Sequence, residues 1–265
     1  MGLVCVFVNQ KGGVGKTTSA INIGAFLAEA GKKVLLVDFD AQGNLTSGIG
    51  VRAPKPGIYE LLSGNASTEE AIRQTEVFNL EVIPADRDLS GAAVEFIKQK
   101  DRNYILKNDL APLKERYDYI LIDCPPSLGQ LTMNGIAAAD LMLIPMQCEY
   151  FAMEGLKELF HTTKQIQKSL NTSLRVGGIF FTMYDPRTRL ANDVIKLISE
   201  TYKDKVLNTI IPRNIRLSEA PSYGMPVSIY DRQCPGARAY YALAHEILQR
   251  EKHEIEKPIG GTDAA

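Results

Sequence analysis

Apolar runs of about 18 residues, the length needed to cross a membrane, are missing from this sequence of 265 residues. The N-terminus also lacks a basic region, and its apolar run Leu3–Val8 is too short for a secretory signal. Four cysteines are present, but no two of them form a CxxC pair and their spacings match no zinc-binding pattern. We therefore expect a cytoplasmic protein with ordinary reduced thiols and no membrane association.

An excess of charge of either sign is missing too. The 30 basic and 31 acidic residues leave a net charge of -1, so nucleic acid would be bound only through a local basic patch. Hydrophobic residues make up 45% and charged residues 23%, which is close to the average of globular proteins and excludes disordered and fibrous classes.

Short apolar, strand-like runs alternate with helix patterns along the chain. This alternation predicts an α/β fold with a doubly wound, mostly parallel sheet flanked by helices. Helices are expected from Thr17 to about Ala30, where Gly31 ends the first, and from about Phe151 to Leu170. Residues 1–251 are expected to form one domain, and the polar residues 252–265 a disordered tail. The predicted strands are Leu3–Val8, Val34–Val37, Leu80–Ile83, Tyr119–Ile122, Leu141–Ile144 and Val176–Phe181.

The sharpest motif lies between the first predicted strand and the first predicted helix. Its glycines allow backbone N–H groups to turn toward phosphate oxygens, and the helix N-terminus adds partial positive charge. A lysine then reaches the β- and γ-phosphates, and a threonine hydroxyl can bind Mg²⁺. The motif therefore predicts a phosphate-binding loop for ATP and Mg²⁺. Its residues are Lys11, Gly12, Gly13, Val14, Gly15, Lys16, Thr17 and Thr18.

One departure from the ordinary loop pattern indicates which kind of phosphate-binding loop this is. Gln10 stands where that pattern has its first glycine, and Lys11 adds a second lysine five residues before Lys16. The loop thereby resembles the deviant Walker A motif of the ParA/MinD family of ATPases. The resemblance implies that Lys11 crosses a dimer interface and touches the nucleotide of the partner, as an arginine finger does.

Three aspartates resemble further motifs of that family. Asp38 and Asp40 follow the second strand in a segment like the family's D-x-D-P-Q motif, with Ala41 in place of proline, and Asp123 ends a strand like a Walker B strand. The resemblance implies that Asp40 orients or deprotonates the attacking water, while Asp38 and Asp123 contact Mg²⁺ through water. All three fall at carboxyl ends of predicted strands, where open α/β sheets bind their ligands.

Three later segments, 146–155, 182–188 and 211–222, are similar to chromosomal ParA, the Soj branch of the family. By that resemblance Pro212 and Asn214 border the adenine, and Arg187, Arg213 and Arg216 form the basic positions for nonspecific DNA binding. It further implies a partitioning ATPase that forms an ATP-dependent homodimer and binds double-stranded DNA on the nucleoid. A centromere-binding partner of the ParB type would stimulate ATP hydrolysis and return the chain to monomers.

Other members of the superfamily remain as alternatives. A MinD-like membrane ATPase would need a basic amphipathic last helix, whereas here the polar side of that helix mixes Arg238 and Arg250 with Glu246 and Glu251, which favours packing in the core. A reductase like the nitrogenase iron protein would hold an iron–sulfur cluster between subunits, and Cys124 after the Walker B aspartate is the one residue that favours it. Tyrosine kinases of the superfamily need a tyrosine-rich tail, and no tyrosine follows Tyr241.

Overall fold

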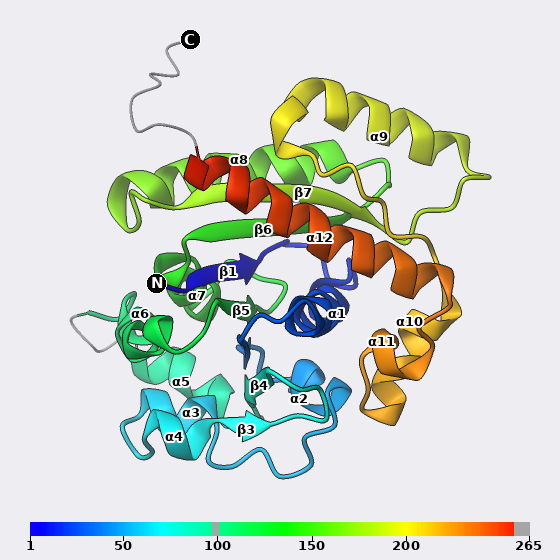
Figure 1. Cartoon of the computed structure of the whole chain (residues 1–265). Helices are drawn as coiled ribbons and strands as arrows, with labels where there is room; N and C mark the ends of the chain where they lie inside the picture. The colour runs from blue at the N-terminus through cyan, green and yellow to red at the C-terminus, as the bar shows by residue number, and fades with distance from the viewer. Residues whose placement is uncertain (97–100, 257–265) are drawn as a thin grey trace.

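A central sheet organises the molecule (Figure 1). The computed structural model describes residues 1–96 and 101–256, and these residues form one sheet of seven strands in the order β3-β4-β2-β5-β1-β6-β7. Every pair is parallel except β3 with β4 at one edge. The strands are β1 Leu3–Phe7, β2 Val34–Asp38, β3 Arg73–Gln74, β4 Leu80–Ile83, β5 Tyr119–Asp123, β6 Leu141–Gln147 and β7 Arg175–Thr182.

Helices cover both faces of the sheet, as the predicted doubly wound fold requires. Against one face pack α1 Lys16–Glu29, α2 Asn44–Gly48, α10 Ile215–Glu219, α11 Val227–Tyr230 and α12 Pro235–Glu256. The other face carries α3 Ile58–Leu62, α4 Thr68–Ala71, α5 Leu89–Phe96, α6 Ile105–Leu110, α7 Gln130–Ala138, α8 Ala152–Ser169 and α9 Arg189–Tyr202. Short 3₁₀ helices span Ala111–Glu115, Lys203–Lys205 and Ala220–Tyr223.

The strand pattern divides the core in two because successive side chains point to opposite faces of a sheet. In β1, Val4 and Val6 join the core under α3–α9, whereas Cys5 and Phe7 join the core under α1 and α12. Both sets of side chains are almost completely buried. A strand buried on both faces reads as an unbroken apolar run, which is why the sequence predicts these strands.

All six predicted strands are confirmed, with ends that differ by at most three residues. The two predicted helices are confirmed as α1 and α8, and Gly31 adopts the left-handed conformation (φ +83°) that ends α1. Helix α12 runs to Glu256, so residues 252–256 continue a helix where the sequence predicts the start of a disordered tail. Residues 257–265 of that predicted tail lie outside the described residues.

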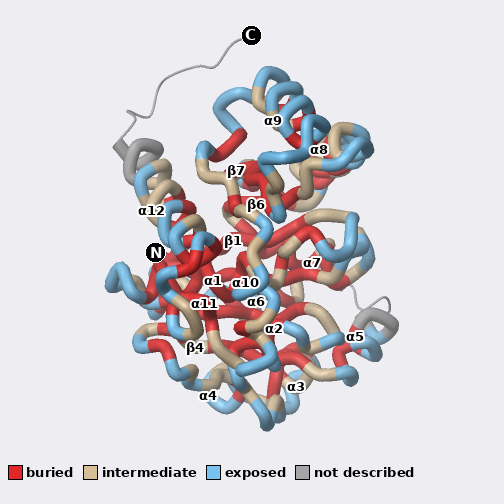
Figure 2. Tube along the Cα trace, turned by 90° about the vertical axis from the view of Figure 1, so that its right-hand side faces the viewer, coloured by how far each residue is buried: buried red, intermediate tan, exposed pale blue. Residues whose placement is uncertain are grey.

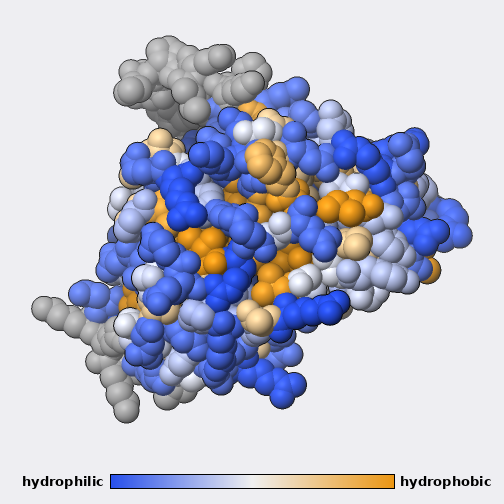
Figure 3. Space-filling view, turned by 60° about the horizontal axis from the view of Figure 1, so that its bottom comes forward, coloured by the Kyte–Doolittle hydropathy of each residue, from blue (hydrophilic) through white to orange (hydrophobic). Residues whose placement is uncertain are grey.

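The carboxyl ends of the parallel strands meet at one edge of the sheet, which Figure 2 views end-on. There Phe7 of β1, Asp123 of β5 and Asp38 of β2 are neighbours in register. The molecular face in Figure 3 is mostly hydrophilic, and its apolar side chains lie in separate patches between hydrophilic ones. Within the part of the chain that the structure describes, no helix is long and apolar enough to cross a bilayer.

Candidate functional site

The predicted phosphate loop connects β1 to α1 at this edge of the sheet. Gly13 (φ +74°) and Gly15 (φ +88°) both adopt the left-handed conformation that disfavours other residues. A Cβ on Gly13 would meet nothing within 4 Å, so the concave side of the loop is open. In the described chain, no backbone N–H from Gly12 to Thr18 has a hydrogen-bond partner. The loop therefore presents a set of free donors, as an anion-binding site requires.

Side chains from neighbouring strands hold the loop from outside through its carbonyl oxygens. Thr182 Oγ1, at the end of β7, donates to the carbonyl of Val14 at 2.8 Å and to that of Met146 at 3.2 Å. Gln147 Nε2, at the end of β6, donates to the carbonyl of Gly13 at 3.1 Å. These bonds fix the peptide planes, so the free N–H groups are preorganised. Neither residue was predicted to hold the loop, although a polar residue at the carboxyl end of an apolar strand is a usable signal.

Lys16 closes the loop from within. Its Nζ donates to the carbonyls of Asn9 at 3.2 Å and Lys11 at 3.4 Å, and the residue is 7% exposed. Burial lowers the pKa of Lys16, and the nearby carboxylates of Asp123 and Asp40 oppose that shift. A buried ammonium that is bonded only to carbonyls is poised to exchange them for an anion.

Asp123 is buried at the end of β5, and neither carboxylate oxygen has a hydrogen-bond partner of ordinary geometry among the described residues. Burial raises its pKa to about 8, and the charge of Asp38 acts in the same direction, while the nearby Thr17 hydroxyl and Lys16 charge oppose the shift. Leaving a buried carboxylate without a partner is costly. A cation bound next to Asp123 would therefore stabilise its carboxylate.

Asp38, the neighbour of Asp123 in register, is in a different situation. Its Oδ2 accepts hydrogen bonds from the N–H and hydroxyl of Thr46 at 2.8 and 2.6 Å, and its Oδ1 accepts one from the N–H of Asp40 at 3.3 Å. Burial raises the pKa of Asp38 to about 6 against these bonds. Asp38 thus anchors α2 to the sheet end, and its predicted contact with Mg²⁺ stays a prediction. Asp40 itself is half-buried, and its Oδ1 caps the turn by accepting from the N–H of Gln42 at 3.0 Å.

The two residues predicted to border the adenine are brought to the loop. Pro212 and Asn214 line a cavity of about 310 Å³ together with Gly15 and Thr18. Ile211 pairs alongside the end of β7 by donating its N–H to the carbonyl of Phe181 at 2.8 Å, which brings this segment beside the loop. The cavity thus borders the phosphate loop directly. The roles of Pro212 and Asn214 stay predictions.

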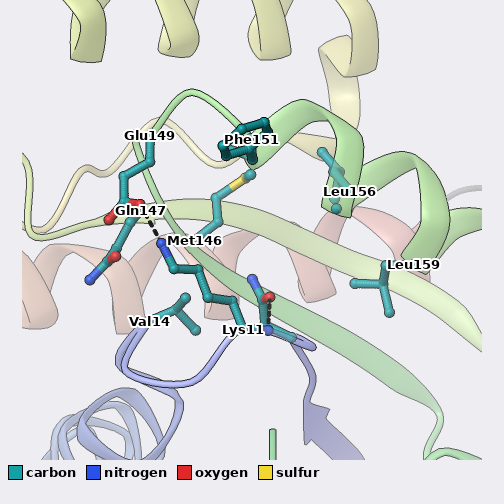
Figure 4. A pocket seen from close by; sticks show the side chains of 11 residues that line it. Lys11, Val14, Met146, Gln147, Glu149, Phe151, Leu156 and Leu159 are labelled. Atoms are coloured by element: carbon teal, nitrogen blue, oxygen red, sulfur yellow. Dashed lines mark hydrogen bonds and ion pairs between the residues drawn. The ribbon is translucent and has the colours of Figure 1, made fainter. Parts of the chain in front are cut away.

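Lys11 stands apart from the other loop residues because it is exposed and forms an ion pair with Glu149, which follows β6 (Figure 4). The Lys11 side chain therefore points toward the loop before α8. Exposed ion pairs of this kind contribute about 0–1 kcal/mol. Lys11 can leave Glu149 at little cost.

The three arginines predicted for DNA binding occupy two places. Arg187 forms hydrogen bonds of 2.9 and 2.6 Å with Asp185, and the charge of Arg213 also reaches that carboxylate, so that the pKa of Asp185 falls to about 2. Arg216 instead pairs with Glu219 at 2.8 Å and Asp231 at 3.3 Å. Arg187 and Arg213 thus act on the same carboxylate and Arg216 pairs with two others, so phosphate binding would compete with these carboxylates.

Features that would favour the alternative families are absent at the positions concerned. Cys124 is buried in the core against α7, where a Cβ on Gly135 would lie 2.6 Å from its Sγ, so its thiol does not reach the surface as a bridging cluster would require. The apolar residues of α12, Tyr240, Leu243, Ala244 and Ile247, are buried against α1 and the sheet. The prediction that this helix packs in the core is confirmed.

Thr182→Val removes the hydroxyl that holds the loop and keeps the shape of the side chain. We expect the free energy of unfolding to fall by about 1–3 kcal/mol, because the hydroxyl that Val14 and Met146 share as a donor is lost inside the protein. We also expect nucleotide affinity to fall as the loop loosens. Urea unfolding and titration with a fluorescent ATP analogue measure the two effects. Thr182→Ser retains the hydroxyl and should behave as wild type; equal losses in both variants would show that the methyl group, not the hydrogen bonds, matters.

Comparisons with known proteins agree with this geometry. A family model described as an AAA domain matches residues 2–176. The chain is 61% identical to the chromosome-partitioning ATPase Soj of Treponema pallidum over 95% of this chain and 99% of that protein. It is 49% identical to the sporulation initiation inhibitor protein Soj of Bacillus subtilis over 93% of this chain and 98% of that protein.

Two solved structures show the same fold. One, described as cobyrinic acid a,c-diamide synthase from Mycobacterium smegmatis with bound ADP and magnesium, has a TM-score of 0.85 and 36% identity over 99% of this chain and 100% of that chain. The cell division ATPase MinD of Pyrococcus furiosus has a TM-score of 0.77 and 28% identity over 94% of this chain and 100% of that chain.

The parallel sheet and the glycine loop between β1 and α1 define a P-loop ATPase. The chain belongs to the Soj/ParA family of chromosome-partitioning ATPases.

Proposed function

We propose that the phosphate loop binds ATP with Mg²⁺ and that this site drives chromosome or plasmid partitioning. The observation that carries the proposal is the loop itself, which combines free N–H groups from Gly12 to Thr18 with the buried Lys16 ammonium. The unpartnered carboxylate of Asp123 fits a divalent cation beside the loop, and the Thr17 hydroxyl lies near it. When bound, Mg²⁺ supplies charge that neutralises the phosphates.

Different residues of this chain have separate roles in nucleotide binding and hydrolysis. The loop N–H groups and Lys16 hold the phosphate oxygens, and the metal would be held by the Thr17 hydroxyl and, through bound water, by Asp38 and Asp123. Pro212 and Asn214 enclose the base in the cavity next to Gly15. Asp40, half-buried two residues after β2, has a charge that opposes the lowering of the Lys16 pKa by burial, and it orients or deprotonates the attacking water.

Assembly follows from the position of Lys11. Two ATP-bound chains pair face to face, and each Lys11 leaves Glu149 to reach the phosphates of the other chain. An exposed lysine tied only by an ion pair to Glu149 supports this exchange. The relatives from Treponema pallidum and Bacillus subtilis are Soj proteins, in keeping with a partner of the ParB type that stimulates hydrolysis and returns monomers.

The dimer then binds double-stranded DNA without sequence preference, in the cytoplasm and on the nucleoid. With a net charge of -1, the affinity must come from arginines that dimerisation doubles, among them Arg187, Arg213 and Arg216. The buried apolar stripe of α12 speaks against the MinD-like alternative, in which the last helix lies on a membrane. Lipid flotation with ATP discriminates between the two, and we expect no flotation.

The experiment that tests this proposal is sizing of the protein with ATP, with ADP and without nucleotide. We expect dimers with ATP, and monomers with ADP or without nucleotide. Monomers under all three conditions would contradict the proposed assembly.

Arg216→Ala tests the DNA surface. We expect weaker binding to every duplex sequence alike, because phosphate contacts carry no sequence information. If about four phosphates are neutralised per dimer, the logarithm of wild-type affinity falls with the logarithm of salt concentration with a slope of about -3.6. Gel shifts with random-sequence duplex in ATP and ADP measure this, and dimer size is the control. Arg187→Ala should weaken binding to a smaller extent in the same gel shifts. An Arg216→Ala dimer that binds DNA as wild type does would place the basic surface elsewhere.

A further inference from the structure

A second cavity, separate from the one next to Pro212, opens beside Lys11 and is called here the α8 pocket (Figure 4). It measures about 310 Å³, and its apolar walls include Val14, Met146, Leu156 and Leu159. Lys11 and Glu149, both about half exposed, form its polar rim. An apolar cavity of about 150 Å³ already binds benzene, so this pocket has room for an aromatic ring.

Gly155, inside α8, also lines the pocket. A Cβ at this position would meet nothing within 4 Å, so packing within this chain does not require glycine. Glycine in a helix is less stable than alanine, and here no internal contact compensates. The missing side chain leaves room for a group from outside the chain.

Two aromatic side chains project next to the pocket. Tyr150 and Phe151 are 75% and 72% exposed and pack edge to face at 5.0 Å between ring centres. Phe151 belongs to the pocket wall, whereas Tyr150 does not line the pocket and faces outward. One surface thus carries both an apolar pocket and an aromatic side chain that is mostly exposed to solvent.

Such a surface is self-complementary, because in a two-fold symmetric dimer each copy offers the same patch to the other. We propose that the α8 pocket receives Tyr150 of a second copy of this chain. The ring would contact the apolar walls, and the hydroxyl would reach the polar rim, as tyrosine does at interfaces that are apolar at one end and wet at the other. The inference rests on the proposed dimer, since Lys11 on the rim of the pocket is the residue that crosses to the partner.

The test measures dimerisation with AMPPNP and Mg²⁺ by analytical ultracentrifugation over a range of protein concentrations. Tyr150→Ala removes the projecting ring, and Gly155→Leu fills the pocket from inside. Each symmetric variant loses two contacts, so at about tenfold per contact we expect about 100-fold weaker dimerisation. Gly155→Ala leaves most of the pocket open and should dimerise as wild type does. Affinity of all four proteins for a fluorescent ATP analogue should be unchanged, which controls for folding.

Mixing the two weak variants gives the sharpest result. In the mixed dimer, Tyr150 of the Gly155→Leu chain meets the open pocket of the Tyr150→Ala chain, so one contact returns. We expect the mixed dimer to be about tenfold tighter than either variant alone. A mixed dimer no tighter than the two parents would overturn the proposed insertion.

The remaining outcomes separate this inference from the function on which it rests. If wild type dimerises and Lys11→Ala does not, but Tyr150→Ala dimerises as wild type does, only the insertion of Tyr150 is wrong. If Gly155→Leu weakens dimerisation and Tyr150→Ala does not, another group occupies the pocket and the inference also fails. If wild type stays monomeric with AMPPNP, both the proposed dimer and the insertion are overturned.

Discussion

Asp40→Ala is expected to bind ATP with wild-type affinity and to hydrolyse it at least about 100-fold more slowly, the lower end of what a positioned acid–base group contributes. Binding survives because the phosphate contacts come from the loop N–H groups and Lys16, whereas the Asp40 carboxylate accepts its hydrogen bond from the backbone N–H of Gln42. Turnover fails because neither of the two neighbouring carboxylates, Asp38 and Asp123, can replace that of Asp40. Asp38 is fully bonded to Thr46 and Asp40, and Asp123 is buried. Single-turnover hydrolysis and equilibrium binding of ATP separate the two effects.

The same variant should accumulate as a dimer in ATP, because hydrolysis is the proposed route back to monomers. Asp40→Asn is the matched control. It keeps the cap on the Gln42 N–H, which maintains the turn, but loses the negative charge. Equal losses in both variants would assign the effect to the charge, whereas a much smaller loss in Asp40→Asn would assign it to hydrogen bonding of the water. Normal turnover in Asp40→Ala would exclude Asp40 as the catalytic residue.

The sequence could predict the strands and the loop because both depend on local pattern. A strand buried on two faces is a continuous apolar run, and the loop needs glycines at fixed spacing before a lysine. The short helices α2 to α6 were not predicted. With four to eight residues each, they are too short to show a helical period, and contacts with the sheet face hold them in place.

Site residues that depend on distant partners were out of reach. Nothing in the sequence shows that Thr46 returns to occupy Asp38, or that Thr182 bonds to Val14, which lies 168 positions earlier. The ion-pair partners of two predicted DNA-binding arginines, by contrast, lie close to them in the sequence. Asp185 stands two positions before Arg187, and Glu219 three positions after Arg216 on α10. Opposite charges two or three positions apart in the sequence therefore predict local ion pairs, and these compete with DNA phosphates for the arginines.

Lys11→Ala and Lys16→Ala should fail at different steps, although both remove a lysine from one loop. Lys16 is buried under the loop, so its loss removes charge-assisted hydrogen bonds to the phosphates of about 1.5–3 kcal/mol, or at least about tenfold in ATP affinity. Lys11 is exposed and points to Glu149, away from its own loop. Lys11→Ala should therefore bind ATP as a monomer with wild-type affinity. It should not dimerise, and its partner-stimulated turnover should fall by about 10³-fold, the lower range for a catalytic cation supplied in trans.

Titration of a fluorescent ATP analogue, followed by sizing in ATP, resolves the two defects. Glu149→Gln is the control for Lys11, because it breaks the same ion pair and leaves the lysine free to cross. If the proposed trans role is right, Glu149→Gln dimerises in ATP while Lys11→Ala stays monomeric. If the ion pair itself is what the loop needs, both variants lose ATP affinity together. If Lys11→Ala dimerises in ATP like wild type, the proposed trans role is wrong. The loop is then an ordinary phosphate-binding loop, in which Lys16 is the lysine that contacts the nucleotide.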